Sequence, residues 1–353
     1  MNQPFVHLRV HSEYALVDGT VRLKPLVQAT KEARMPAVAI TDPANLFGLV
    51  KFFKSAVAEG IKPIVGTDVW VEDKDPSAEP GLLVLLAIRQ EGYRTLSRIL
   101  SRGHAEARQT DGKIVLPRQW LEADAGGLIA LSGAADGDVG RAILNDQAEE
   151  ARVRAGYWQT VFPEGFYLEV QRLGRAFDEA HVAGAVALSQ QANIPLVATN
   201  DVRFLDQDGF EAHEVRVCIQ QGRTLDDPRR VKQYSEDQWF KPAEAMVELF
   251  KDLPQAVSNS VKIAERCSVI LGLGQSYLQE YPVPEGQTMA DYLAVVTREG
   301  LAERFQRFPE TKMQPADNWQ QPYFDRLDFE LEIINGMGFP GNHFHLPIRL
   351  PSI

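Results

Sequence analysis

The sequence is poor in cysteine and has no long apolar run. Its 353 residues include only two cysteines, Cys218 and Cys267, which do not form a C-x-x-C pair. A disulfide framework and a thiolate zinc site are therefore excluded. No uncharged apolar stretch reaches the roughly 18 residues that a membrane span requires, and residues 1–14 lack the pattern of a signal peptide. We therefore expect a soluble, cytoplasmic protein with no membrane partner.

Basic residues are scarce relative to acidic ones. Lys and Arg number 37 against 48 Asp and Glu, so the formal net charge is -11. A surface with this balance repels phosphate backbones, and any contact with nucleic acid must be local or supplied by another region. The length fits two domains or one large barrel.

Short apolar runs alternate with amphipathic helical patterns through most of the chain. The seven runs that predict strands are 5–10, 37–41, 61–71, 82–88, 128–132, 166–170 and 196–199. This alternation is typical of a parallel sheet with crossover helices, and seven strands are close to what a barrel needs. Helices are predicted over 23–34 and from residue 46 onward, the latter with Asn45 as N-cap and Gly60 as its end.

The pattern changes near the end of the chain, where strand signals stop. Thr288 and Asp291 have the spacing of a capping box, and 323–337 predicts a second helix that ends at Gly338. We therefore predict a domain boundary near 275–285, followed by a mainly helical region.

Polar side chains gather where the predicted strands end. His11 and Asp18 follow the first strand, Asp42 ends the second, Asp68 lies late in the third, and Asp201 follows the last. Because the carboxyl ends of barrel strands meet at one face, these groups should converge there. Each also has a simpler interpretation, since Asp42 before Pro43 and Asp201 after Asn200 are ordinary turn residues.

Two arginines stand among these candidate ligands. Arg9 lies two residues before His11, and Arg203 lies two residues after Asp201. A guanidinium has no lone pair for a metal and stays charged. Phosphoester hydrolysis by two or three metals needs a dense set of imidazoles and carboxylates. The candidates found here include too few of them.

Several collinear segments resemble the opening of the alpha subunit of bacterial DNA polymerase III. They are 5–14, 17–19, 35–42, 45–48, 60–66, 197–204, 323–327 and 334–341. The resemblance implies a polymerase and histidinol phosphatase (PHP) domain at 1–280, folded as a distorted seven-stranded β/α barrel. It further implies an incomplete, mainly helical beginning of the polymerase palm region at 281–341, and a tail at 342–353 that does not match.

Members of this family with an active PHP domain hold three metals and act as 3′-5′ exonucleases. The positions that match their site are His11, Asp18, Asp42 and Asp201. By the same resemblance, Arg9 and Arg203 replace histidines and Asp68 replaces a glutamate, which implies a degenerate site and a separate proofreading exonuclease (epsilon) subunit. We predict that both arginines pair with Asp42, Asp68 or Asp201, because carboxylates that have lost their ions need other positive charge.

The palm carboxylates that hold Mg²⁺ in the full-length polymerase have no counterpart in these 353 residues. We therefore expect an N-terminal fragment that is inactive as a polymerase on its own. No firmly bound cofactor is expected, and any weak metal would use His11, Asp42 and Asp201. Expected partners are the epsilon subunit and other replicase subunits, with primer-template DNA reached only through missing regions. The alternatives are an active metal-dependent PHP phosphoesterase or exonuclease, and a pure protein-binding module.

Overall fold

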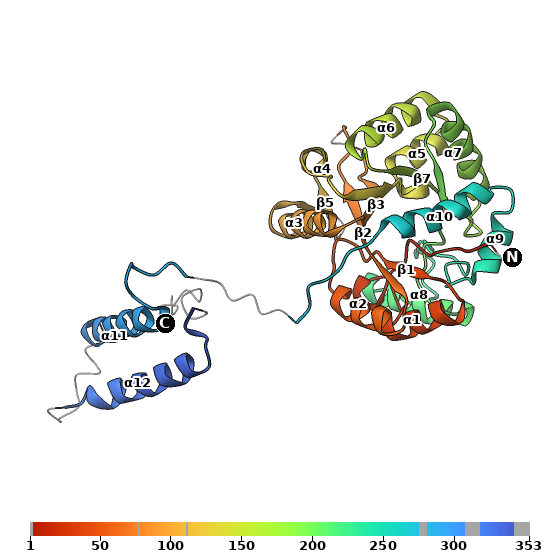
Figure 1. Ribbon diagram of the computed structural model, residues 1–353. Helices are drawn as coiled ribbons and strands as arrows, with labels where there is room; N and C mark the ends of the chain where they lie inside the picture. The colour runs from red at the N-terminus through yellow and green to blue at the C-terminus, as the bar shows by residue number, and fades with distance from the viewer. Residues whose placement is uncertain (1–2, 76–77, 111, 275–280, 308–317, 342–353) are drawn as a thin grey trace. The chain divides into compact units, whose positions relative to one another are not determined.

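The structure is a computed structural model that describes residues 3–75, 78–110, 112–274, 281–307 and 318–341. The chain forms two compact units, Met1–Leu271 (unit 1) and Gly272–Ile353 (unit 2) (Figure 1). This division falls just before the predicted boundary near 275–285. The predicted tail, 342–353, lies outside the described residues.

Unit 1 is built around one sheet. Its strands, among the described residues, are β1 (Ala37–Ile40), β2 (Lys62–Val71), β3 (Gly81–Ala87), β4 (Arg108–Thr110), β5 (Lys113–Leu116), β6 (Leu128–Leu131), β7 (Phe166–Val170) and β8 (Leu196–Ala198). Neighbouring strands follow the order β4-β5-β2-β3-β6-β7-β8, and β1 pairs with β2. Six of the seven predicted strands are therefore present, and the short β4–β5 hairpin is an addition that its few, partly charged residues did not signal.

The first predicted strand, Phe5–Val10, is not a regular strand, but it closes the sheet into a ring. On one side Ala39 and Thr41 of the β1 segment donate backbone hydrogen bonds to His7 (2.9 Å) and Val10 (2.8 Å). On its other side the segment 5–10 pairs with the chain after β8, through a bridge between Val10 and Val202. Ala39 and Thr41 are two positions apart, whereas His7 and Val10, which accept their hydrogen bonds, are three positions apart. The segment 5–10 therefore contains one extra residue, as in a β-bulge. The bulge explains why the ladder is irregular here.

The bulge also decides which side of the sheet each side chain of this segment lies on. Val6 and Leu8 belong to the apolar cluster that fills the inside of the ring. His7 instead packs against the ring of Phe240, with centroids 4.5 Å apart, so it is a core histidine. Because one extra residue shifts the alternation, Arg9 follows Leu8 on the inner side.

The expectation that all strands run parallel is wrong for β3. This strand is antiparallel to both β2 and β6, whereas β1–β2, β6–β7 and β7–β8 are parallel as expected. Only residues 72–80 connect β2 to β3. A parallel crossover needs a dozen or more residues, so the short connection can only return the chain antiparallel.

Helices surround the ring in Figure 1. Those of unit 1 are α1 (Leu23–Glu32), α2 (Leu49–Ala58), α3 (Gln90–Glu106), α4 (Arg118–Ala123), α5 (Asp138–Leu144), α6 (Ala148–Val161), α7 (Asp178–Ala192), α8 (Phe210–Gln221), α9 (Ala243–Leu249) and α10 (Pro254–Arg266). Gly60 has φ +74 beyond the end of α2, as predicted. Asn45 is not the N-cap, however, because α2 begins four residues later with Gly48 as its N-cap, and Asn45 accepts the Phe47 N–H in a local turn (3.1 Å).

Helix α10 lies across the amino ends of the strands. Ser260 accepts a hydrogen bond from the Val6 N–H at 3.1 Å. Asn259 donates to the carbonyl of Leu196, the first residue of β8, at 2.7 Å. The amino end of the ring is thus covered, and the candidate site residues lie toward the opposite, carboxyl ends of the strands.

Unit 2 contains two described helices, α11 (Met289–Arg307) and α12 (Gln321–Gly336). Half of the predicted capping box is present: the Thr288 hydroxyl accepts the Asp291 N–H at 3.2 Å, but it also donates to the Asp291 carboxylate at 2.6 Å, which in a capping box would accept the Thr288 N–H. Phe305 of α11 packs against Tyr323 and Phe324 of α12, with ring centroids 5.5 and 5.9 Å apart, and is 6% exposed. No helix in the described ranges is both long and apolar enough to cross a membrane.

Candidate functional site

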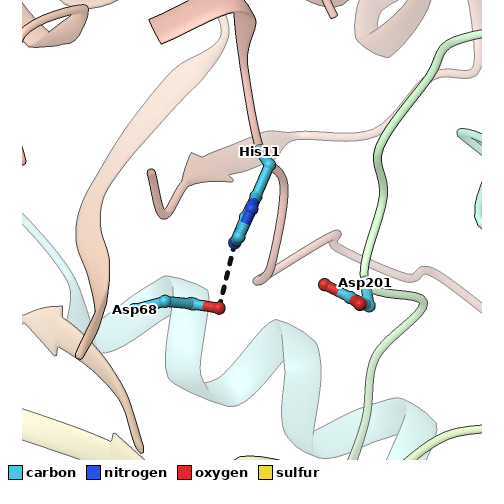
Figure 2. Close-up of side chains that lie close together, drawn as sticks. All are labelled: His11, Asp68 and Asp201. Atoms are coloured by element: carbon cyan, nitrogen blue, oxygen red, sulfur yellow. Dashed lines mark hydrogen bonds and ion pairs between the residues drawn. The ribbon is translucent and has the colours of Figure 1, made fainter. Parts of the chain in front are cut away.

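Three side chains from distant parts of unit 1 meet at the carboxyl ends of the strands. His11, Asp68 and Asp201 each offer an atom within 4.8 Å of the others, and Figure 2 shows them pointing toward a common centre. The His11 Nε2 atom lies 2.9 Å from Asp68 Oδ2. All three are almost completely buried, with exposures of 2%, 2% and 4%.

Arg9 enters this group from the bulged first segment. Its guanidinium contacts Asp68 Oδ2 through both Nε and Nη2 at 2.9 Å, and its Nε lies 3.3 Å from Asp201 Oδ1. Its third carboxylate neighbour is Glu169, at 3.5 Å. One buried guanidinium therefore touches three carboxylates.

Arg203 approaches the same group from the chain after β8. Its Nη2 donates to both oxygens of Asp201, at 2.8 and 3.0 Å, and its Nη1 donates to Asp18. Asp18 also lies 3.2 Å from His11 Nδ1. The two arginines thus pair with Asp68, Asp201 and Asp18. We call Arg9, His11, Asp18, Asp68, Asp201 and Arg203 the ion-pair cluster.

Asp42 is the one predicted site residue that does not join the ion-pair cluster. Its two oxygens accept hydrogen bonds from the Ser12 N–H (2.6 Å) and the Ser12 hydroxyl (2.7 Å). Neither arginine pairs with it among the described contacts. The candidate metal set of His11, Asp42 and Asp201 is corrected accordingly, because Asp68 and not Asp42 completes the group of three.

Two further groups of residues reach the cluster without having been predicted. On β7, Glu169 is fully buried and accepts hydrogen bonds from Thr199 (2.5 Å) and Gln171 (3.0 Å). A charged residue in the apolar run of β7 was a usable signal in the sequence. Tyr234 and Gln238 come from an irregular segment with no such signal, and they donate to Asp18 (3.1 Å) and Asp201 (2.8 Å).

The surrounding charges set the protonation of the cluster. Burial opposes ionisation of Asp201, yet Arg203, Arg9 and His11 together hold its pKa well below the ordinary value. Burial and Arg203 lower the pKa of His11, but Asp68 and Asp18 outweigh them and raise it to about 9. Protonated His11 and the two guanidinium groups then balance the carboxylates of Asp18, Asp68 and Asp201.

Two neighbouring carboxyl groups behave differently. Burial raises the pKa of Glu169, against the lowering effects of Arg9 and the Thr199 hydrogen bond. Burial also raises the pKa of Asp42, with the Ser12 hydrogen bonds acting in the opposite sense. These two groups therefore need less compensating positive charge than Asp18 and Asp201, whose pKa values are lowered.

The donor set does not fit a divalent cation while both arginines keep these positions. Asp68 Oδ2 already accepts from Arg9 and contacts His11, and both oxygens of Asp201 accept from Arg203. Within the described structure, Asp68 Oδ1 is the only oxygen of these two carboxylates that lacks a hydrogen-bond partner. One free oxygen is too few, because zinc takes about four ligands and magnesium about six.

Comparisons with known proteins agree on one family. Residues 7–173 match the model of the PHP domain. The chain is 48% identical over 342 residues to the DNA polymerase III subunit alpha of Pseudomonas fluorescens, and 49% identical over 341 residues to that of Pseudomonas aeruginosa. Each match covers 97% of this chain and 29% of the relative.

Among solved structures, an amidohydrolase from Chromobacterium violaceum is similar with a TM-score of 0.41 and 13% identity, over 61% of this chain and 97% of that one. The chain spans less than a third of the length of its polymerase relatives, and it contains a PHP domain. It belongs to the family of bacterial DNA polymerase III alpha subunits, of which it represents the N-terminal portion.

Proposed function

We propose that this chain is the PHP region of a replicative DNA polymerase alpha subunit and that its barrel is a scaffold without exonuclease activity. The observation that carries the proposal is the engagement of Asp68 and Asp201 by Arg9 and Arg203. Both arginines occupy the place where positive metal charge would otherwise sit. Because a guanidinium cannot activate water as a bound metal does, the cluster contributes structure and not catalysis.

The energetic role of the cluster follows from its burial. A buried charge without a partner costs several kcal/mol, so removing one member of a buried pair typically destabilises a protein by about 3–5 kcal/mol. Arg9 and Arg203 are 1% and 6% exposed. They therefore hold together β2, the bulged first segment and the chain after β8.

A scaffold role requires a partner, and we propose the proofreading exonuclease (epsilon) subunit. Unit 1 exposes large apolar side chains, with Ile219 75%, Leu16 64% and Phe47 61% exposed. Leu16 and Ile219 lie on neighbouring segments, since Arg216 of α8 donates to the Leu16 carbonyl at 2.9 Å. Exposed apolar surface of this kind is typical of sites where proteins bind one another.

Template-directed DNA synthesis belongs, in this proposal, to the full-length subunit. The carboxylates that would hold Mg²⁺ for nucleotidyl transfer would come from the remaining part of the polymerase, as would the main contacts with primer-template DNA. The net charge of -11 is consistent with that division of roles. The chain alone would then be inactive as a polymerase, and its place of action would be the cytoplasm.

A second candidate function is metal-dependent phosphoester hydrolysis. The observation that favours it is the close approach of His11, Asp68 and Asp201, together with the unpartnered Asp68 Oδ1. This function would require Arg9 and Arg203 to move away from the carboxylates. Their burial and multiple ion pairs make the scaffold the better-supported choice.

The two functions are separated by one set of measurements on the purified chain. Nucleotide release from 3′-labelled single-stranded DNA is measured with and without Mn²⁺, and binding of Mn²⁺ and Zn²⁺ is measured by calorimetry. If the barrel is a scaffold, the chain should release no nucleotides and should not bind Mn²⁺ or Zn²⁺ tightly. It should capture the purified epsilon subunit. Mn²⁺-dependent release that is lost in an Asp201→Ala variant shown by circular dichroism to be folded would establish the phosphoesterase instead.

A further inference from the structure

A long irregular segment lies between α8 and α9. Residues 222–238 contain turns but no helix or strand. Connections longer than about 12–15 residues without secondary structure are uncommon in compact domains and often cover or complete a site. We call residues 222–238 the strap.

Near its end the strap contacts the ion-pair cluster through Tyr234. The Tyr234 hydroxyl donates to Asp18 Oδ2 at 3.1 Å. Its ring lies 5.3 Å from the guanidinium of Arg203 and packs edge-on against His213 at 4.7 Å. A tyrosine whose ring and hydroxyl both contact charged members of the cluster is held at two points.

Gln238 provides the second attachment of the strap. Its side chain donates to Asp201 Oδ2 at 2.8 Å, and its carbonyl accepts the Arg203 N–H at 2.8 Å. The preceding residue is fixed as well, because the Asn200 side chain donates to the carbonyl of Asp237 at 2.9 Å. The strap is thus bound to the same short stretch, 200–203, that supplies Asp201 and Arg203.

The middle of the strap covers α8. Arg230 donates to Glu214 at 2.6 Å and to the sulfur of Cys218 at 3.1 Å. Cys218 is 4% exposed. Access to this thiol therefore depends on whether Arg230 and the strap around it stay in place.

We propose that the strap is a closing device over the carboxyl end of the barrel, latched by Tyr234 and Gln238 onto Asp18 and Asp201. The latched strap keeps water and nucleic acid from the ion-pair cluster. It also competes with any ligand of the cluster, since Asp18 Oδ2 and Asp201 Oδ2 are the oxygens that Tyr234 and Gln238 hold. Opening of the strap is then a local event that does not require the barrel to unfold.

Arg203 links the latch to the cluster. It pairs with Asp18 and Asp201 on its charged side and lies against the Tyr234 ring. Each latch residue therefore binds a carboxylate that Arg203 orients. The arginine that neutralises the cluster is, in this proposal, also the part on which the strap closes.

The test uses the two cysteines as reporters in the intact chain. Cys218 lies under the strap, whereas Cys267 is 1% exposed and packs in the apolar cluster inside the ring, away from the strap. The rate of maleimide labelling at each cysteine is followed by mass spectrometry. The double variant Tyr234→Phe/Gln238→Ala is compared with wild type and with Gln233→Ala, an exposed strap residue outside the latch.

If the strap is latched as proposed, maleimide should react with Cys218 at least about tenfold faster in the double variant, because two hydrogen bonds to charged groups are lost. Cys267 should react at the wild-type rate. Hydrogen exchange should accelerate over 222–238 in the same variant and remain unchanged in Gln233→Ala. An unchanged Cys218 rate overturns the proposal. So does a parallel acceleration at Cys267, because that would report general loosening of the barrel in place of a latch.

Discussion

One guanidinium nitrogen of Arg203, Nη2, bridges the two carboxylate oxygens of Asp201 at 2.8 and 3.0 Å inside the protein. The two residues are close in sequence, and Asp201 has φ 44, in the left-handed region. Aspartate tolerates this conformation better than most residues. The turn brings the side chains at 201 and 203 onto the same cluster, where a third group, Arg9, lies against Asp201 as well.

Removal of the Asp201 carboxylate should strongly destabilise unit 1. Asp201→Ala leaves Arg9 and Arg203 buried with fewer counter-charges, and we expect a loss of about 3–5 kcal/mol in the free energy of unfolding. Urea denaturation followed by tryptophan fluorescence measures it. Asp208→Asn, an exposed change on a nearby turn, should stay within about 0.5 kcal/mol of wild type. A similar small effect for Asp201→Ala would show that the pair is not a structural element.

Stability should fall as the pH rises through the range in which His11 loses its proton. The folded-state pKa of about 9 lies above the ordinary 6.5. The contribution of protonated His11 is therefore complete below about 6.5 and disappears by about pH 9, and it is worth at most about 3 kcal/mol. Denaturation curves at pH 6, 7.5 and 9 measure the trend. In His11→Asn the trend should be much flatter, and an equally steep loss in that variant would assign the effect to another group.

At low pH the stability of unit 1 should depend mainly on the carboxylates of the ion-pair cluster. The pKa values of Asp18 and Asp201 are held well below the ordinary 3.8, by Arg203 and other cluster charges that outweigh burial. Their stabilising contribution is complete above about pH 4 and is lost as the pH falls below that value. Acid titration monitored by near-UV circular dichroism should show unit 1 unfolding later in wild type than in Arg203→Met. Coincident acid transitions would contradict the ion-pair account.

Glu169→Gln should destabilise unit 1 less than Glu169→Ala does. Burial raises the pKa of this carboxyl group, and its Oε2 has no hydrogen-bond partner in the described structure. Glu169→Gln keeps the shape and an acceptor for Thr199, whereas Glu169→Ala leaves a cavity and unpaired donors, costing about 2–4 kcal/mol. Relative to wild type, the Gln variant should gain stability as the pH rises above the ordinary carboxyl pKa of 4.5. Equal losses in both variants would show that the negative charge itself is required.

Replacement of the two arginines by histidine should create a metal site. Arg9→His/Arg203→His frees Asp68 Oδ2 and Asp201 Oδ1 and adds imidazoles beside the three-residue group of His11, Asp68 and Asp201. We expect Zn²⁺ or Mn²⁺ binding by calorimetry in the double variant and none in wild type. Arg9→Gln/Arg203→Gln, which removes the charges without adding ligands, is the matched control and should bind much more weakly. A folded double histidine variant that binds no metal would refute the predicted role of the arginines.

Local structure was predictable wherever neighbouring residues decide it. The strands from β1 to β8 that carry continuous apolar runs, the end of α2 at Gly60 and the Thr288–Asp291 cap all depend on contacts within a few residues. The antiparallel course of β3 was not predicted, because the apolar run of a buried strand is the same in either direction. The change in side-chain alternation after Leu8 was likewise not predictable from the sequence, since a bulge depends on the partner segment.

The sequence by itself determined that unit 1 is a PHP-type β/α barrel and that acidic groups, one imidazole and two arginines meet at the strand ends. Which of them touch was decided only by the tertiary structure. Asp42, which follows the predicted strand 37–41, hydrogen-bonds to Ser12, whereas Asp68, late in the predicted strand 61–71, contacts Arg9 and His11. The covering strap with Tyr234 and Gln238 carried no sequence signal at all. Apart from Asp201–Arg203 and His11–Asp18, these contacts join residues far apart in the sequence, such as Arg9 with Asp68 and Arg203 with Asp18, so their geometry exists only once the barrel has closed.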